Sequence, residues 1–384
     1  MEKVKNIPAL RFPEFEGEWI DSRFGNYISE RSERAKVSFP LYSLTIEQGI
    51  VPKTERYERS FLVSNQKEAY KSMYFNDFAF NPMNLRFGAL ARHKEERPVA
   101  VSKYYNVFYC NQIGNSVFFE NYLTSSRLIR YYNLMATGSL IEKKRVHFSD
   151  FINFTKPLPS LPEQTRIASF LTAVDEKLTQ LKKKKTLLEQ YKKGVMQQLF
   201  SQQLRFKQDD GSEFPEWEEK RLGDCLAYEQ PTKYLVSSTE YNNSFKTPVL
   251  TAGKTFILGY TDETNGIFSE NLPVIIFDDF TTATQFVTFP FKAKSSAMKI
   301  LLPKEKVNIK FVFEGLQLIN YELGGHERHW ISKFSQMEIS IPSYNEQTKI
   351  ANFLSAIDEK ISHCQLQIEK MELWKKGLLQ RMFI

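Results

Sequence analysis

Two runs of residues approach the patterns of enzyme active sites, and both fall short of them. Asn81–Pro82–Met83–Asn84 lacks the second proline and the aromatic residue of an N-P-P-Y loop, whose ring would stack on a flipped base. Ala252–Gly253–Lys254–Thr255 resembles the end of a phosphate-binding loop, but Pro248 stands where the first glycine must be. We therefore interpret residues 81–84 as a turn after a strand, and we expect no nucleotide-binding loop at residues 252–255.

Two other runs carry side chains that can bind metals. His326–Glu327–Arg328–His329 is one residue shorter than H-E-x-x-H, the spacing that places two histidines on one helix face around zinc. A loop that gathers donors for phosphates or base edges is the favoured interpretation, and a purely structural loop is the alternative. Asp278–Asp279 has no lysine at nuclease spacing beside it, so we interpret it as a buried strand that ends in a solvated turn. The sequence thus predicts no catalytic residue and no metal site.

Side chains that can bind DNA gather in two parts of the chain. Basic groups neutralise phosphates, and Arg86 or Arg92 can instead bind a guanine edge through two hydrogen bonds. Because charged loop residues are usually just solvated, we expect about a third of the candidates to touch DNA. The candidates of the first part are Arg86, Arg92, His93, Lys94, Lys143, Lys144 and Arg145. Those of the second part are Thr251, Lys254, Thr281, Thr282, Lys292, Lys294, Ser295, Ser296, Arg328 and His329.

The elements that must position these clusters follow from a duplication. The stretch from Ser160 to Phe200 returns without a gap from Ser343 to Phe383, and both copies contain S-x-x-E-Q-T, I-A, F-L, D-E-K and K-K-G. The S-x-x-E spacing at the start of each copy predicts a capping box, in which a hydroxyl and a carboxylate satisfy free amides at a helix start. Each copy is therefore expected to be a long helix.

Apolar residues in both copies recur at alternating intervals of four and three. A seam with this period buries itself against another helix, and the simplest partner is the other copy. The predicted contacts are Ile167, Leu171, Val174, Leu178, Leu181 and Leu188 in the first copy, and Ile350, Leu354, Ile357, Ile361, Ile368 and Met371 in the second. Lys185, Lys192 and Lys375 interrupt the seam. The run Lys182–Lys185 points all round a helix, so we interpret it as a solvated face.

The whole chain is one unit read twice: a leading segment, a globular domain and a long helix. Trp19, Arg23 and Gly25 of the leading segment recur as Trp217, Arg221 and Gly223, and Arg145 near the end of the first domain aligns with Arg328. The predicted boundaries are residues 1–157 for the leading segment and first domain, 158–206 for the central helix and its tail, 207–341 for the second leading segment and domain, and 342–384 for the last helix.

Both globular domains are predicted to be α+β with mostly antiparallel sheet. Aromatic and β-branched runs predict strands at residues 41–45, 61–63, 73–80 and 99–101, and at 249–251, 256–258, 274–277, 285–289 and 298–302. A helical pattern from about residue 118 to 135 ends at Gly138, and another from about 308 to 323 ends at Gly324. The expected fold is two such domains separated by two long helices that pair as an antiparallel coiled coil, in a pseudo-twofold internal repeat.

The bulk composition narrows the class of protein further. A length of 384 residues suits two or three domains, and a formal net charge of +7 favours an acidic partner such as nucleic acid. Cys110, Cys225 and Cys364 lie far apart without a C-x-x-C pattern, so we expect three reduced thiols. No apolar run is long enough to span a membrane, and no signal-type stretch follows Met1. We expect a cytoplasmic protein.

The duplicated motif P-S-x-x-E-Q-T-[RK]-I-A-x-F-L-x-A-[VI]-D-E-K resembles the specificity subunit of type I restriction-modification systems. Residues 81–89 resemble a common first target-recognition domain of that family, and residues 248–253, 259–261, 277–279 and 329–331 resemble another. The likeness covers essentially the whole chain. It implies a subunit without a catalytic site, in which each of two target-recognition domains reads half of a bipartite DNA sequence.

The resemblance also implies partners. The paired helices would fix the spacing of the two half-sites and dock two methylation subunits. Those subunits would carry S-adenosylmethionine, and restriction subunits would bring ATP and Mg²⁺, while this chain would bind no cofactor. Two other functions stay open: a coiled-coil adaptor whose domains bind protein, and a self-contained DNA methyltransferase, which the missing motifs disfavour.

Overall fold

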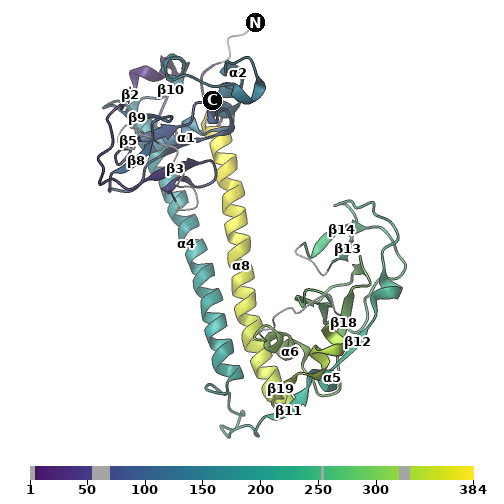
Figure 1. The fold of residues 1–384 in the computed structure, drawn as a ribbon. Helices are drawn as coiled ribbons and strands as arrows, with labels where there is room; N and C mark the ends of the chain where they lie inside the picture. The colour runs from purple at the N-terminus through teal and green to yellow at the C-terminus, as the bar shows by residue number, and fades with distance from the viewer. Residues whose placement is uncertain (1–4, 54–69, 252–254, 320–328) are drawn as a thin grey trace. The chain divides into compact units, whose positions relative to one another are not determined.

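A computed structural model describes residues 5–53, 70–251, 255–319 and 329–384. They form two compact units, one made of Met1–Lys182 with Leu366–Ile384 and the other of Lys183–Gln365. The boundary between the units cuts both long helices near their middles (Figure 1). Each helix therefore contributes one part to the core of each unit.

The first unit begins with a globular domain of short strands and helices. Its strands are β1 (Ile20–Arg23), β2 (Ile28–Glu30), β3 (Tyr42–Thr45), β4 (Gly49–Pro52), β5 (Tyr70–Met73), β6 (Phe78–Phe80), β7 (Leu90–Arg92), β8 (Val99–Ser102), β9 (Asn106–Cys110) and β10 (Thr155–Leu158). Its helices are η1 (Phe24–Asn26), η5 (Leu85–Phe87), α1 (Ser116–Leu123), α2 (Ser126–Met135), η6 (Ile141–Lys143) and α3 (Phe148–Phe151), and the first long helix is α4 (Leu161–Phe200).

The strands of this domain pair antiparallel. The main sheet has the order β2-β9-β6-β7, and three two-stranded sheets pair β1 with β10, β3 with β4, and β5 with β8. The strand predicted at 73–80 is two strands, because Asn76 at φ 68° turns the chain between them. The helix predicted at 118–135 is likewise broken, since α1 ends with its C-cap Thr124 and Ser125 caps α2 by accepting a hydrogen bond from the Leu128 amide. Gly138 is not its C-cap, which is Ala136.

The second unit holds a domain built on the same plan. Its strands are β11 (Glu218–Arg221), β12 (Leu226–Glu229), β13 (Thr247–Leu250), β14 (Ile257–Thr261), β15 (Val274–Asp278), β16 (Thr284–Val287), β17 (Lys292–Ala293), β18 (Met298–Pro303) and β19 (Glu338–Ile341). Its helices are α5 (Leu222–Cys225), η7 (Pro231–Tyr234), α6 (Ile309–Leu316), α7 (His329–Ser332) and η8 (Phe334–Gln336), and the second long helix is α8 (Tyr344–Met382).

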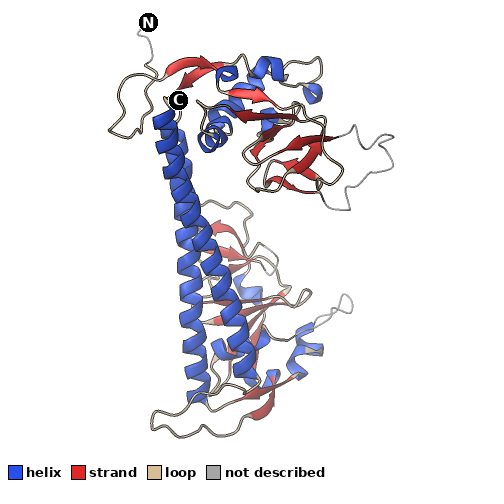
Figure 2. Ribbon diagram, turned by 90° about the vertical axis from the view of Figure 1, so that its left-hand side faces the viewer, coloured by secondary structure: helices blue, strands red, loops and turns tan. Residues whose placement is uncertain are grey.

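The sheets of the second unit confirm the mostly antiparallel prediction. The main sheet has the order β12-β18-β15-β16 and is antiparallel throughout, whereas in the sheet β14-β13-β17 the β13–β17 pair is parallel. Figure 2 shows the strands and helices of both domains. The helix predicted at 308–323 is confirmed in its first part, where Asn308 is the N-cap, but it ends at Leu316, and Gly324 lies outside the described residues.

The two long helices pack antiparallel within each unit. In the first unit Asp175 binds Lys375 at 2.5 Å and Lys182 binds Glu372 at 2.6 Å. The residue numbers rise along α4 while those of the paired residues fall along α8, so the two helices run antiparallel. In the second unit Lys192 binds Asp358 at 2.7 Å. The predicted seam is buried at Ile167, Leu171, Val174, Leu178, Leu181, Ile350, Leu354, Ile357 and Ile368. Ile361 and Met371 pack on the cores while partly exposed, and Leu188 is partly exposed.

The predicted capping boxes are wrong, because the two glutamates hold other groups. Glu163 accepts two hydrogen bonds from Arg11, both at 2.8 Å, and one from the Trp19 indole at 3.1 Å. Glu346 accepts the same set from Arg205 and Trp217. Both glutamates are almost fully buried, and a two-point arginine bond is the strongest available partner for a buried carboxylate. Each leading segment is therefore fastened to the start of a long helix.

The glutamine after each of these glutamates ties the helix to the globular domain. Gln164 accepts a hydrogen bond from the amide of Asn115, the N-cap of α1, and donates to the Pro159 carbonyl. Gln347 does the same with Asn308, the N-cap of α6, and Pro342. The E-Q pair of the repeated motif is thus explained by domain attachment in both units.

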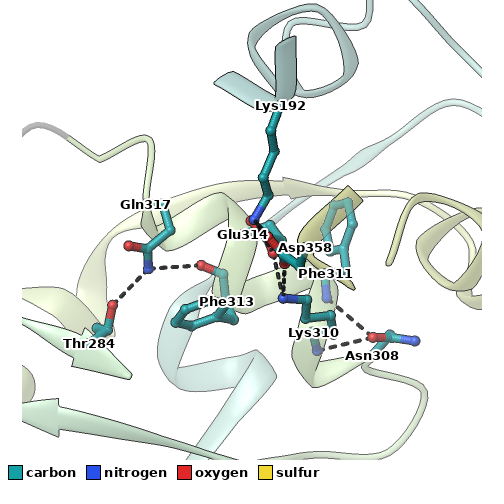
Figure 3. A network of polar contacts seen from close by, with 9 residues as sticks. All are labelled: Lys192, Thr284, Asn308, Lys310, Phe311, Phe313, Glu314, Gln317 and Asp358. Carbon is teal, nitrogen blue, oxygen red and sulfur yellow. Dashed lines mark hydrogen bonds and ion pairs between the residues drawn. The ribbon is translucent and has the colours of Figure 1, made fainter. Parts of the chain in front are cut away.

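Four charged side chains in the second unit extend this attachment (Figure 3). Lys192 on α4 binds Glu314 at 2.9 Å and Asp358 at 2.7 Å, and Lys310 binds the same two carboxylates at 2.6 and 2.8 Å. Glu314 is fully buried, so all of its charge is balanced inside the protein. The network joins α6 of the domain to both long helices. Lys192 therefore points inward, although the sequence pattern made it only an interruption of the seam.

We expect the network to lose its stabilising effect at low pH. Burial raises the pKa of the Asp358 carboxyl, but hydrogen bonds from Lys192 and Lys310 outweigh it and lower that pKa overall. The stabilisation is then present above the ordinary aspartate pKa of about 3.9 and is lost as the pH falls through the lower folded value. The Asp358→Asn variant should therefore lose free energy of unfolding at pH 6 and approach the parent chain below about pH 3. An equal difference at both pH values, measured by urea unfolding, would contradict this assignment.

Candidate nucleic-acid interface

The first domain presents its candidate residues on two adjoining segments. Residues 81–84 form a turn, as predicted, in which the Asn81 side chain accepts a hydrogen bond from the Met83 amide, and the short helix η5 completes the loop 81–89. Gly88 closes the loop at φ 96°, and a Cβ there would lie 3.2 Å from Ile129 on α2. The Val146 amide donates to the Pro82 carbonyl at 3.0 Å, which joins the turn to the segment that carries Lys143–Arg145. The structure thus brings Arg86 and these three cations into one region.

The side chains of this region have the exposure that a phosphate-binding surface needs. Lys143 and Arg145 are exposed and Lys144 is partly exposed, and no carboxylate among the described residues pairs with any of them. The guanidinium of Arg86 lies 4.2 Å from the centroid of the exposed Phe87 ring. Basic groups beside an exposed ring can contact both a phosphate and a base.

The other candidates of the first domain bind partners within the protein. Arg92 binds Glu120 at 3.0 Å and donates to the Asn76 side chain, and Lys94 binds the same glutamate at 2.7 Å. His93 is 1% exposed and donates from Nε2 to the Arg97 carbonyl. DNA contact by His93 is therefore contradicted by its burial. Arg92 would have to give up its ion pair with Glu120 in order to bind a base. The Lys94 side chain stays largely exposed despite its ion pair.

In the second domain, backbone hydrogen bonds gather the candidate segments at one edge. The Lys294 amide donates to Leu250 at the end of β13, the Asp279 amide to Ala297, and the His329 amide to Asp279. The ends of β13 and β15, the turn after β17 and the start of α7 therefore adjoin. Exposed or partly exposed side chains at this edge are Thr251, Thr281, Thr282, Lys294, Ser295 and Ser296.

Two candidates of this domain are buried instead. Lys292 is 3% exposed, binds Glu263 at 2.8 Å and donates to the Asn265 carbonyl, so a phosphate-binding role is contradicted. His329 is also buried, at 1% exposure. Thr281 donates its hydroxyl to Asp278, and Thr251 donates to the Thr255 carbonyl, which fixes both side chains at the edge. Lys254 and Arg328 lie outside the described residues, as does the rest of the run 326–328.

Strand β15 is buried and ends in a turn that exposes Phe280 and Thr281, as predicted, but Asp279 at the start of that turn is buried. Asp279 binds Lys299 at 3.2 Å and accepts a hydrogen bond from the Trp330 amide, and both groups of the ion pair are almost fully buried. Within the described part of the chain no group of three or more histidine, cysteine or acidic side chains could hold a metal ion. The two aspartates therefore order the edge of the domain. Among the described residues no helix is long and apolar enough to cross a membrane.

The sequence pattern did not identify the side chains that hold the two domains. Arg11 and Arg205 belong to recurring Leu-Arg-Phe triplets, and the amides of Leu10 and Leu204 donate to Arg381 and Gln198, which are equivalent positions of the two copies. The triplet was a visible signal. The triplet did not align with the recurring tryptophan, because Trp19 lies eight positions after Arg11 whereas Trp217 lies twelve positions after Arg205.

Comparison with known proteins identifies the family. The family described as type I restriction modification DNA specificity domain matches residues 85–190 and 215–371, which is more than half of the chain. The chain belongs to this family. This confirms the resemblance drawn from the duplicated helix motif.

Individual relatives agree with this assignment. The specificity subunit of the type I restriction enzyme EcoR124I/EcoR124II from Escherichia coli is 54% identical over 126 residues, or 32% of this chain and 31% of that protein. A putative type I restriction enzyme MjaX specificity subunit from Methanocaldococcus jannaschii is 29% identical over 287 residues, or 66% of this chain and 65% of the relative. The chain thus spans less than two thirds of either protein in the matched regions.

A solved structure supports the fold. The S subunit of a type I restriction-modification system from M. genitalium superposes with a TM-score of 0.63 at 14% identity, covering 98% of this chain and 99% of that one. Likeness at this identity concerns the architecture. It agrees with the predicted combination of α+β domains and long helices.

Proposed function

We propose that this chain is a non-catalytic subunit that recognises a double-stranded DNA sequence for a type I restriction-modification complex. The observation that carries the proposal is that the two units share the contacts that attach each domain to its long helix but differ in the side chains that each domain exposes. Both units repeat the arginine and tryptophan bonds to a buried glutamate and the glutamine bridge to the first helix of the domain. The exposed polar edges differ, with basic residues in one domain and threonine, serine and lysine in the other. Two domains that are attached by the same contacts but expose different side chains suit the recognition of two different half-sites.

The proposal extends to the partners. Each domain reads one half of an asymmetric bipartite site, and the helices set the spacer and dock two methylation subunits, with restriction subunits completing the complex. Equivalent helix surfaces in the two units would bind two identical copies of one partner. The methylation subunits supply S-adenosylmethionine, and the restriction subunits supply ATP and Mg²⁺ chemistry.

The test is a gel shift with the full chain, its methylation subunit, and duplexes drawn from the sites methylated in the host. Specific binding to one bipartite duplex only when the methylation subunit is present supports the proposal. Methyl transfer by the isolated chain would identify a self-contained methyltransferase. Absence of DNA binding under every condition, with both proteins folded, would favour a protein-binding adaptor.

Arg145 gives a prediction for the sequence-independent part of binding. This exposed residue precedes Val146, whose amide donates to the Pro82 carbonyl of the loop 81–89. Its counterpart in the second repeat is Arg328. The Arg145→Ala variant should weaken binding to all duplexes and reduce the slope of log K against log salt by about 0.9, the value for one phosphate contact. Salt titrations of specific and nonspecific duplexes measure this. A change in the methylated sequence would instead show that Arg145 reads a base.

A further inference from the structure

A cavity of about 650 Å³ in the first unit lies outside the region of Arg86 and Lys143–Arg145. It opens between the start of α2 and the C-terminal part of α8. Its polar lining includes Ser126, Arg127 and Arg130 from the recognition domain, and Lys375, Lys376 and Gln380 from the long helix. The start of α2 and the C-terminal part of α8 thus both place basic side chains at this cavity.

Most of this positive charge is not balanced within the protein. Arg127, Arg130 and Lys376 are exposed, and no carboxylate pairs with any of them in the part of the chain that the structure describes. Lys375 binds Asp175, and the one acidic lining residue, Glu372, binds Lys182. The pKa of the nearby Lys156 is lowered, first by burial and then by the positive charge of Arg127.

The second unit balances the corresponding charge internally. Lys192 occupies the position of Lys375 in the other copy, and it is bound by both Glu314 and Asp358. Counted from the N-caps Asn115 and Asn308, the position of Glu314 is taken in α1 by Asn121. Because Val117 likewise takes the position of Lys310, the first unit lacks both the acid and the second lysine of this junction, and its Lys375 is paired with Asp175. The charge left in the cavity is therefore that of Arg127, Arg130 and Lys376. A cavity that keeps three unpaired cations is suited to an anion from outside the chain.

Helix α2 connects this cavity to the loop 81–89. Ile129 packs against Gly88 of this loop, while Arg127 and Arg130 flank it on the same helix. The start of α2 also carries the positive end of its helix dipole. An anion bound here would hold the helix that supports the loop.

We propose that this cavity binds the phosphodiester backbone of DNA beside the half-site that the first domain reads, an inference that rests on the proposed function. Arginine presents a planar fork that matches phosphate oxygens, and α2 supplies two of them. The contact carries no base information, so it sets the position of the duplex rather than its sequence.

The experiment compares two variants with a matched control. Arg127→Ala/Arg130→Ala and Lys376→Ala remove the cations of the cavity, and Lys193→Ala removes the exposed lysine at the position equivalent to Lys376 in the second unit. The complex with methylation subunits is titrated over a range of salt with a duplex of its mapped methylation site. The arginine double variant should reduce the slope of log K against log salt by about 1.8 and the affinity roughly 10- to 30-fold at 0.15 M salt. Lys376→Ala should reduce the slope by about 0.9. Lys193→Ala should match the parent chain, and the methylated sequence should stay the same.

Three outcomes would overturn the proposal. An unchanged slope in the double variant, with its circular dichroism and unfolding midpoint preserved, shows that no phosphate binds there. Failure of that variant to assemble with methylation subunits in the absence of DNA shows that the cavity holds a protein. A third outcome is that inorganic phosphate raises the melting temperature of the parent chain but not of the double variant, while the double variant keeps the parent slope of log K against log salt. This outcome shows a site for a free anion rather than for DNA. Absence of specific binding by the parent complex would instead refute the proposed function.

Discussion

A chain that ends at Gln203 is expected to dimerise and, with the methylation subunit, to direct modification to an interrupted palindrome. The fragment exposes the seam of α4, including the buried Leu171 and Val174, and needs a helix of nearly the same sequence to cover it. A second copy provides that helix. Both recognition domains would then be identical, so the half-sites must form an inverted repeat.

The ion pairs support this substitution. Lys192 binds Asp358, whose equivalent in the first copy is Asp175, and Lys375 binds Asp175 in the same way. A dimer of the fragment can therefore place Lys192 of each copy on Asp175 of the other. Ending the chain before Arg205 matters, because Arg205 would otherwise compete with Arg11 for Glu163.

The run Lys182–Lys185 opposes the dimer. If Lys192 meets Asp175, residues 183 and 184 lie at the twofold axis, where two sets of four lysines would face each other. The second copy has Gln365, Leu366, Gln367 and Ile368 at these positions. Dimerisation should thus strengthen with salt, and the four matching substitutions Lys182→Gln, Lys183→Leu, Lys184→Gln and Lys185→Ile should tighten it at low salt.

Sedimentation of the fragment at several salt concentrations measures the dimer, and mapping of methylated bases identifies its site. Modification of an inverted repeat of the first half-site supports the account. A soluble monomer in both forms of the fragment, or modification still at the parent sequence, would show that the two helices are not interchangeable.

The Glu314→Gln variant is expected to lose about 3–5 kcal/mol of unfolding free energy from the second unit. The substitution leaves Lys192 and Lys310 with only Asp358, and both ammonium groups are largely buried. Breaking a buried ion network by removing one partner costs more than the network itself contributes, because an uncompensated charge remains. Urea unfolding of the full chain measures the loss.

Two controls separate this effect from a general loss of charge. Asp175→Asn breaks the more exposed pair with Lys375 and should cost at most about 1 kcal/mol. The double variant Lys310→Val/Glu314→Asn copies Val117 and Asn121, the residues of α1 at the same places, and leaves Lys192 with Asp358 alone. It should recover most of the stability. A loss from Glu314→Gln no larger than that from Asp175→Asn would contradict the role of the network.

The long helices were predictable because their signal is repeated and periodic. Seam residues such as Leu171 and Leu354 are fully buried, and the four-three spacing predicted this without knowledge of the partner. The capping boxes failed for a related reason. A serine and a glutamate three residues apart fit the local pattern, but a partly buried arginine and an indole from the leading segment bind Glu163 instead. Tertiary contacts of this kind leave little trace in local spacing.

The candidate interface was predicted less completely, because residue type does not reveal burial. Lys292 and Arg145 look alike as basic loop residues, yet one lies inside an ion pair with Glu263 and the other is exposed. Arg127 and Arg130 were overlooked in a helix that was expected to be continuous. Their place beside Lys376 depends on how α2 packs against α8, which no spacing along the chain encodes.

Sequencing of methylated bases in cells that express the full chain with its methylation subunit tests the central claim most directly. Two domains on equivalent frames with different edges predict one bipartite site, in which two unlike half-sites flank a spacer of fixed length. Modification of a continuous site or of a single half-site, or no sequence-specific modification that depends on this chain, would contradict the account.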